Sequence, residues 1–179
     1  MMLWCAIFVD RPAAGPADEH GCTPVGLRDR QALFADLDKV FSAEGPQRLL
    51  AIFALDGLGE YRGFYGRPAA QVMLVRLAGR FVSTLGNAGS CYQPREDEFV
   101  GLFNMSLPGA TLLTGRLVAA LNLQDAQATV SATFGGVLLP DDANDPPAAV
   151  RLADLRLSAN SPRRRARRDQ ATTPDYATA

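Results

Sequence analysis

The residues with the clearest chemical potential form a short charged segment, Arg95-Glu96-Asp97-Glu98. Carboxylate oxygens are the hard ligands that Mg²⁺ and Ca²⁺ prefer, so adjacent carboxylates on a tight turn could bind a divalent cation. The same composition is also typical of an acidic turn that only faces water. The choice between these interpretations depends on what the rest of the chain places around the segment.

Two short apolar runs flank the charged segment, Ser90–Gln93 before it and Phe99–Met105 after it. This arrangement is typical of a β-hairpin whose turn carries the charges. Pro94 fits near such a turn, because its missing N–H group removes no hydrogen bond from the strand ladder there. We therefore predict a hairpin that presents the acidic residues at its tip.

The overall composition is that of one globular domain. The chain has 179 residues, of which 47% are hydrophobic and 21% charged, so it can bury a sizeable core. Its net charge of −1 gives no overall attraction to nucleic acid or anionic lipid. Five arginines and two aspartates lie in residues 161–179, which we expect to form a disordered tail. Such a tail could contact nucleic acid or lipid, but a solvated terminus is the commoner case, and we expect no nucleic-acid partner.

Cysteine and histidine usage excludes several classes of site. Cys5, Cys22 and Cys91 are far apart and lack CxxC spacing, and His20 is the sole histidine, so we expect no structural zinc site. Unpaired cysteines are typical of the reducing cytoplasm, where we expect this protein to reside. The apolar run Leu3–Val9 is too short to span a bilayer, so we expect no membrane span.

Hydrophobic periodicity predicts an α+β fold. Apolar residues recur at helical spacing after Leu27, and Gly45-Pro46 ends that helix. The continuous apolar run Leu49–Leu55 indicates a buried central strand. Gly57–Gly66 holds four glycines and is expected to be partly loop. The other predicted elements are a helix from Pro68 to Gly86, a helix at Pro108–Asn122, a strand at Ala128–Leu139 with a bulge or bend at Gly135-Gly136, a loop at Asp141–Pro147 and a helix at Ala148–Leu157.

The order of these elements predicts a ferredoxin-like βαββαβ core, with a central antiparallel or mixed sheet flanked by helices. In this topology Leu49–Leu55 and Ser90–Gln93 run parallel, and Phe99–Met105 runs back between them. The hairpin turn then lies beside the C-terminal end of the first strand. We therefore expect Ala54-Leu55-Asp56 and Arg95–Glu98 to share one edge of the sheet, where a metal-dependent nucleotide site could form.

Several stretches are similar to known motifs, and their combined spacing is specific although none is specific alone. Gly26-Leu27-Arg28-Asp29-Arg30 is similar to TGLxNR, Leu55-Asp56-Gly57-Leu58 with Tyr65-Gly66 to DxDxFKxINDxxGHxxGD, Asp97-Glu98-Phe99 to the end of GGDEF, Thr129–Ser131 to the TVSIG strand, and Ala153-Asp154 to the start of ADxALYxAK. From about Val25 to Asn160 the chain therefore resembles the GGDEF domains, the family of diguanylate cyclases. The resemblance implies a nucleotide-cyclase-like fold and an activity that condenses two GTP into cyclic di-GMP.

The resemblance also implies a Mg²⁺ site, from which this chain departs. In the family, the first Asp of DxD ligates Mg²⁺ together with the acidic third residue of GGDEF. That first position is Ala54 here, so Asp97 loses its partner and the usual two-metal phosphoryl-transfer site cannot form. We therefore expect no Mg²⁺ cofactor and no intact catalytic residue, with Asp56, Asp97 and Glu98 as remnants.

Other positions that the family uses for ligands are altered as well. Arginine can donate hydrogen bonds but cannot accept them, so Arg62 cannot replace the Asn that reads guanine. Glu96 adds negative charge where the glycines of GGDEF let a triphosphate approach. The altered positions are Arg62 and Gln71 for guanine, Arg95 and Glu96 for the two glycines, Gly59 and Ser161 for two phosphate-binding lysines, and Gly86 and Gly89 for the inhibitory RxxD site.

Three functions remain open. We favour a catalytically inactive, degenerate GGDEF-like domain that acts as a protein-interaction or regulatory module in bacterial cyclic di-GMP signalling. The alternatives are a non-catalytic receptor for GTP or cyclic di-GMP, with Arg62, Arg67 or Arg95 on the phosphates, and a weak residual cyclase. An exposed arginine on a loop also needs no ligand.

We further predict how the remnant carboxylates are used. Asp56, Asp97 and Glu98 are expected to pair with Arg95, Arg62 or Arg67, in exposed ion pairs that contribute about 0–1 kcal/mol each. Stability alone then need not maintain them, so Arg95-Glu96-Asp97-Glu98 is also a candidate surface for binding a protein partner. The expected division is a lead segment at 1–24, the degenerate domain at 25–160 and the tail at 161–179. No sensor domain fits in that lead, so we expect either that any input signal arrives in trans or that the chain is an adaptor.

Overall fold

The computed structural model describes residues 27–42, 45–104 and 107–161. The predictions for the lead segment, for Met105 and for residues 162–179 therefore lie outside the described residues. None of the helices in the described part of the chain combines the length and hydrophobicity that a membrane span requires. The elements are α1 (Arg30–Ser42), β1 (Arg48–Asp56), α2 (Leu58–Leu85), a 3₁₀ turn η1 (Gly86–Ala88), β2 (Gly89–Arg95), β3 (Glu98–Phe103), α3 (Leu107–Leu121), β4 (Leu123–Gln124), β5 (Thr129–Leu139) and α4 (Pro146–Asn160).

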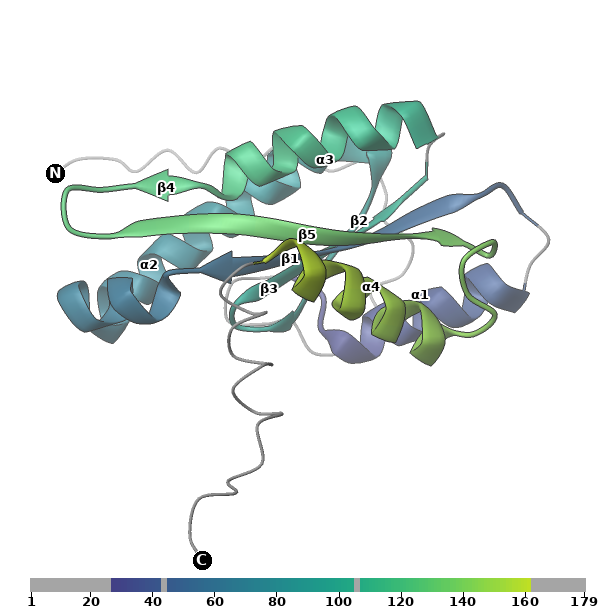
Figure 1. The fold of residues 1–179 in the computed structure, drawn as a ribbon, viewed down its shortest axis with the longest axis horizontal. Helices are drawn as coiled ribbons and strands as arrows, with labels where there is room; N and C mark the ends of the chain where they lie inside the picture. Colours follow the sequence, from purple (N-terminus) through teal and green to yellow (C-terminus); the bar gives the residue numbers. More distant parts are fainter. Residues whose placement is uncertain (1–26, 43–44, 105–106, 162–179) are drawn as a thin grey trace, which may run out of the picture.

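The five strands form one sheet in the order β2-β3-β1-β5-β4 (Figure 1). Every neighbouring pair in this order is antiparallel. Because β3 lies between β1 and β2 and is antiparallel to both, β1 and β2 run parallel to each other. This confirms the predicted α+β, ferredoxin-like arrangement, with an antiparallel sheet.

Helices cover both faces of the sheet, α2 and α3 on one face and α1 and α4 on the other (Figure 1). Successive side chains of β1 alternate between these two layers. Phe53 packs with the α2–α3 core, whereas Ile52 packs with the α1–α4 core. A strand buried on both faces needs a continuous apolar run, and this explains why Leu49–Leu55 was recognisable in the sequence.

Helix α2 begins earlier than the glycine content suggested. The prediction of a partial loop across Gly57–Gly66 was wrong for most of that stretch, because the helix starts at Leu58. The backbone leaves helical geometry at Gly66, where φ is 82° and ψ is 167°. Pro68 therefore lies in the first turn after this break, as its missing N–H group requires.

One glycine of β5 serves packing. β1 pairs with β5 in one uninterrupted register along its whole length, so no bulge forms at Gly135-Gly136, where the sequence would allow a bulge or bend. A Cβ atom at Gly135 would lie 2.2 Å from the carbonyl oxygen of Ala153 and 2.3 Å from the amide nitrogen of Leu157. Glycine at this position therefore lets α4 pack closely against the strand.

Helix α4 begins at Pro146, two residues before its predicted start. The side chain of Asp145 accepts a hydrogen bond from the N–H of Ala148 at 2.6 Å, which caps the first turn.

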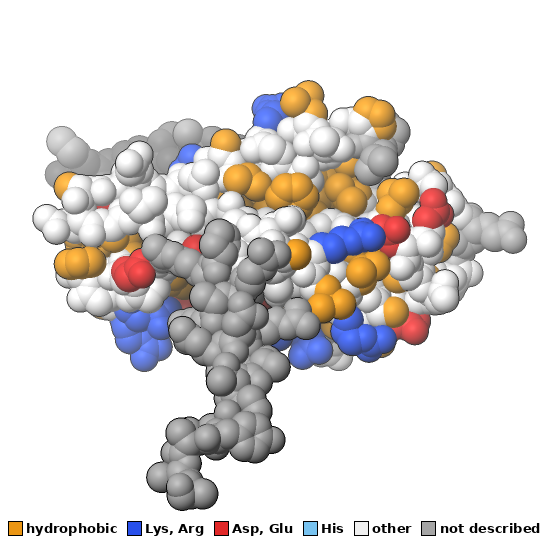
Figure 2. All heavy atoms as spheres, viewed as in Figure 1, with side chains coloured by type: hydrophobic (Ala, Val, Ile, Leu, Met, Phe, Trp, Pro, Cys, Tyr) orange, Lys and Arg blue, Asp and Glu red, His pale blue; other side chains and the backbone are white. Residues whose placement is uncertain are grey.

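The face of the molecule that Figure 2 shows carries basic, acidic and apolar side chains interspersed with one another. Arg156 of α4 forms an ion pair of 2.6 Å with Asp142, which precedes the helix.

Candidate functional site

The hairpin turn and the end of β1 share one edge of the sheet. Ala54 lies directly across from Glu98 in the β1–β3 pairing, and the N–H of Leu55 donates to the carbonyl oxygen of Asp97 at 2.8 Å. Adjacent strands are about 4.8 Å apart, so Ala54 and Asp97 lie well within the two strand spacings that the topology predicted. The predicted juxtaposition is confirmed.

The hairpin turn between β2 and β3 is tight, and hydrogen bonds of Gln93 hold it in place. Glu96 and Asp97 form a two-residue turn between β2 and β3. The strand register shifts between Tyr92 and Arg95, the stretch that includes Pro94. Gln93 fixes this irregular stretch, because its backbone N–H donates to the carbonyl of Arg28 at 2.8 Å and its side-chain amide donates to the carbonyl of Glu96 at 3.2 Å.

Glu98 is buried, unlike the exposed carboxylate that the sequence suggested. Its side chain is 5% exposed, and its Oε1 lies 3.0 Å from Nη1 of Arg95, whose side chain is 63% exposed. A buried carboxylate is strongly destabilising unless a partner compensates its charge. The Arg95–Glu98 pair was predicted as an exposed contact, and that prediction was wrong for Glu98.

A second ion pair joins the turn to α2. Nη2 of Arg62 lies 2.7 Å from Oε1 of Glu96, and both side chains are partly exposed. Both residues stand at positions where the sequence departs from the GGDEF pattern. Arg67, the third candidate arginine, is exposed and forms no ion pair among the described residues.

Asp56, at the end of β1, contacts the C-terminal end of α4. The hydroxyl of Ser161 donates to Oδ2 of Asp56 at 3.2 Å, and the N–H of Ser161 donates to the carbonyl of Leu157. Ser161 is fully buried. Sequence reasoning missed this contact, because the residue stands at the start of a polar, Arg-rich stretch and no local pattern marks it as part of the core.

The position that would complete a metal site holds a methyl group. Ala54 is fully buried between two neighbours, Glu98 on β3 and Thr133 on β5. The hydroxyl of Thr133 is buried and has no hydrogen-bond partner among the described residues. In the part of the chain that the structure describes, no three His, Cys, Asp or Glu side chains gather in a way that could hold a metal ion. The side chain of Ala54 supplies no oxygen ligand.

One position of the family's inhibitory site has no room for a side chain. A Cβ atom at Gly89 would lie 2.2 Å from the carbonyl oxygen of Leu102 on the neighbouring strand β3. An aspartate could not replace this glycine without displacing the strand. The absence of the RxxD pattern is therefore built into the packing of β2 against β3.

A polar cluster between α1 and β2 was not predicted. Asp36 accepts hydrogen bonds from the hydroxyl of Tyr92 at 2.6 Å, from Lys39 at 3.0 Å and from Arg28. Burial raises the pKa of Asp36, but these hydrogen bonds and the Arg28 charge outweigh it and hold the pKa below its usual value. Burial, together with Asp36, raises the pKa of Tyr92. The cluster ties α1 and the segment before it to β2, and no sequence motif announces it.

Comparison with known proteins finds matches to this chain among solved structures. No family model and no curated protein matches the chain. The diguanylate cyclase SiaD from Pseudomonas aeruginosa, solved with its activator SiaC, matches with a TM-score of 0.68 and 21% identity. That match covers 76% of this chain and 55% of the SiaD chain, so this chain spans about half of that protein.

Two further structures match over most of their own length. A sensory box/GGDEF family protein from Caulobacter crescentus matches with a TM-score of 0.65 and 27% identity, over 76% of this chain and 94% of that one. The GGDEF domain of DgcB from Caulobacter crescentus, solved in complex with c-di-GMP, matches with a TM-score of 0.68 and 15% identity, over 82% of this chain and 90% of that one. The chain described here therefore has the fold of the GGDEF domains.

Proposed function

We propose that this chain is a catalytically inactive GGDEF-like domain that acts as a protein-interaction or regulatory module in bacterial cyclic di-GMP signalling. The fold supports the general assignment, and so do the matched structures, one of which is a cyclase with an activator protein and another a domain with c-di-GMP. The finer assignment, an inactive module, depends on how the residues at the hairpin edge are used.

The observation that carries the proposal is that the altered residues pair with the hairpin. Arg62 pairs with Glu96, and Arg95 pairs with Glu98. Each arginine stands at a position that the resemblance assigns to nucleotide contact. Since both guanidinium groups already neutralise carboxylates of this edge, a phosphate would have to share each of them with a carboxylate.

The buried methyl group of Ala54 supports the loss of catalysis independently. Phosphoryl transfer of this type needs metal ions that neutralise the developing charge, and their loss removes several kcal/mol of transition-state stabilisation. Each 1.4 kcal/mol is about a factor of ten in rate, so the reaction would slow by orders of magnitude. We propose accordingly that the chain uses no Mg²⁺ cofactor.

The same edge is proposed as a recognition surface. Glu96 is exposed in part, at the tip of a hairpin whose backbone is fixed by Gln93 and Leu55. A rigid, charged tip can present Arg95, Glu96 and Asp97 to a protein partner with little loss of conformational entropy. The remnant carboxylates then have a use that does not require catalysis.

The direct test is a turnover assay of the purified chain with GTP and Mg²⁺, followed by chromatography. We expect no cyclic di-GMP, whereas an active diguanylate cyclase in the same assay confirms that product would be detected. Product that increases with the concentration of this chain would contradict the proposal and favour a weak residual cyclase.

A receptor without turnover is the second candidate, and Arg67 is the observation that favours it. Arg67 is exposed, stands near the turn of α2 that follows Gly66, and forms no ion pair among the described residues. A ligand that binds only the native state raises the melting temperature. Thermal denaturation with GTP or cyclic di-GMP separates the candidates, because a shift that Arg67→Ala abolishes indicates a receptor, and no shift favours the interaction module.

A further inference from the structure

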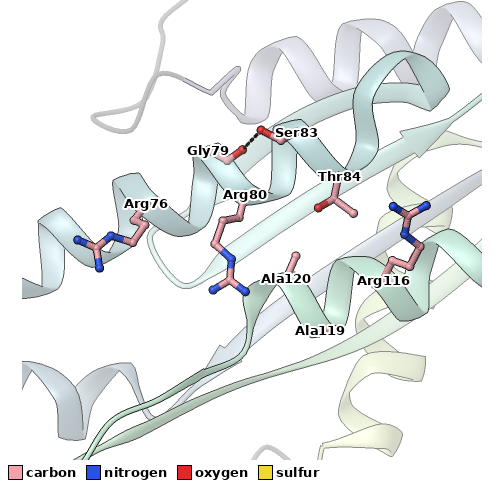
Figure 3. Close-up of a pocket in the computed structure, with 8 residues that line it drawn as sticks. All are labelled: Arg76, Gly79, Arg80, Ser83, Thr84, Arg116, Ala119 and Ala120. Carbon is pink, nitrogen blue, oxygen red and sulfur yellow. Dashed lines mark hydrogen bonds between the residues drawn. The ribbon is translucent and has the colours of Figure 1, made fainter.

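A groove between α2 and α3 combines positive charge with exposed apolar side chains. Its volume is about 690 Å³, and both helices contribute to its walls (Figure 3). No residue of the hairpin edge lines it. The lining residues are Arg76, Gly79, Arg80, Ser83 and Thr84 of α2 and Arg116, Ala119 and Ala120 of α3.

Three arginines give the groove its charge. Among the described residues, Arg76, Arg80 and Arg116 form no ion pair, although Arg80 donates to the backbone carbonyl of Asn122 at 3.4 Å. Arg80 extends from α2 toward α3, and Arg116 extends from α3 toward α2 across from Thr84 (Figure 3). Two guanidinium groups thus bracket the groove, where they can each bind a carboxylate.

Small residues also line the groove. Gly79 comes from α2, and Ala119 and Ala120 come from α3. A Cβ atom at Gly79 would meet no heavy atom within 4 Å, so open space lies above this position. Small side chains on both helices allow the backbone of a third segment to approach closely, as in helix-in-groove recognition.

One helical turn before each of two groove arginines lies an exposed apolar side chain. Val72 is 61% exposed and precedes Arg76 by four residues, and Leu112 is 70% exposed and precedes Arg116 by four. Residues four apart on a helix lie on the same face, so each apolar side chain lies one turn from an arginine of the groove. A small anion would leave Val72 and Leu112 uncovered, whereas a partner helix can contact the arginines and both apolar side chains.

We propose that this groove is the docking site for an acidic, amphipathic helix of a partner protein. From Val72 to Thr84, the α2 wall extends about 18 Å, which a helix of about 12–14 residues matches. Carboxylates on one face of that helix bind the three arginines, and apolar residues beside them cover Val72 and Leu112. The proposal does not depend on the role proposed for the hairpin.

Fluorescence anisotropy with the full chain tests the proposal. The probe is a labelled helical peptide of about 14 residues that carries Glu at every fourth position and Leu beside each Glu on the same face. The control peptide has the same composition in an order that removes the common face. We expect the ordered peptide to bind at least about ten-fold more tightly than the control peptide.

Two pairs of matched variants locate the binding. Arg116→Glu reverses a charge inside the groove, and Arg151→Glu makes the same change on α4, outside it. Gly79→Leu fills the groove without changing the charge, and Gly63→Leu adds the same bulk on α2 outside the lining. A Cβ atom at either glycine meets no heavy atom within 4 Å, so both variants should fold. We expect at least about ten-fold weaker binding for the two groove variants and no change for the two controls.

The contrary outcomes are distinct. Failure of the ordered peptide to bind, equal binding of the control peptide, or unaltered binding by Gly79→Leu would each overturn the proposal. Vesicles that contain phosphatidylglycerol test the membrane alternative by sedimentation. If the vesicles bind, Arg116→Glu releases them and the peptide does not bind, the groove faces a lipid surface and the proposal is wrong.

Discussion

Thr133 on β5 is the direct cross-strand partner of Ala54 on β1, and its buried hydroxyl has no hydrogen-bond partner among the described residues. A buried hydroxyl without a partner destabilises the folded state, because it leaves water without replacing the hydrogen bonds lost. A carboxylate at position 54 could accept that hydrogen bond, whereas the methyl group of Ala54 cannot. Ala54 therefore offers the hydroxyl of Thr133 no side-chain acceptor on the adjacent strand.

Replacement of Thr133 by Val tests this relationship. Valine keeps the shape of the side chain and removes the unpaired hydroxyl, so we expect the free energy of unfolding to rise by about 1 kcal/mol. Urea denaturation measures the change. Thr133→Ser, which keeps the hydroxyl and loses the methyl group, is the control and should be less stable than the wild type. A destabilised Val variant would mean that the hydroxyl has a partner after all.

Glu96 and Glu98 are predicted to differ in energetic weight although they flank the same residue. Glu96→Ala removes a partly exposed ion pair and should reduce the free energy of unfolding by about 0–1 kcal/mol. Glu98→Ala removes a buried carboxylate that contacts Arg95 and should reduce it by about 1–3 kcal/mol. Glu98→Gln keeps the volume and an acceptor, so it should recover part of the loss. Equal effects of the two alanine variants in urea denaturation would contradict the burial of Glu98.

The sequence was sufficient for the topology because the sheet is buried on both faces. A run such as Leu49–Leu55 has few alternatives to a central strand, and the acidic tip between two apolar runs marks a hairpin. Glycine was less informative. Gly135 suggested a bend, but it serves the close approach of α4, and that contact is made by residues about twenty positions away in the chain.

The candidate site was predicted in position but not in detail. The edge shared by Ala54 and Asp97 followed from strand order alone. Which arginine pairs with which carboxylate depends on side-chain directions at a tight turn, and these are not encoded in a local pattern. The same holds for the contact between Asp56 and Ser161, which joins residues 105 positions apart. Sequence periodicity describes single elements, whereas such contacts depend on how the elements pack.

The Asp36 cluster should make the free energy of unfolding depend on pH in the acidic range. The pKa of Asp36 is lowered in the folded state, so its contribution to stability is present above the unfolded value of about 3.9 and is lost as the pH falls through the folded value. Asp36→Asn should therefore flatten the acid side of the pH–stability curve. Asp38→Asn removes a carboxylate from the exposed side of the same helix and is the matched control. Urea denaturation between neutral pH and pH about 3 measures both, and an unchanged acid slope in Asp36→Asn would exclude this role.

Ala54→Asp tests whether one substitution separates this chain from a metal-binding edge. The new carboxylate would be buried beside Glu98, so without metal we expect a loss of about 2–4 kcal/mol in the free energy of unfolding. If Asp97 can complete the site, millimolar Mg²⁺ should restore part of this loss, because a ligand that binds only the native state stabilises it. The wild type should show no such dependence on Mg²⁺, and Ala54→Asp combined with Asp97→Asn should lose the recovery. Thermal denaturation with EDTA and with Mg²⁺ measures all three proteins. A wild-type chain that is itself stabilised by Mg²⁺ would contradict the proposal that the metal site is lost, since its ligands would then have to come from residues other than position 54.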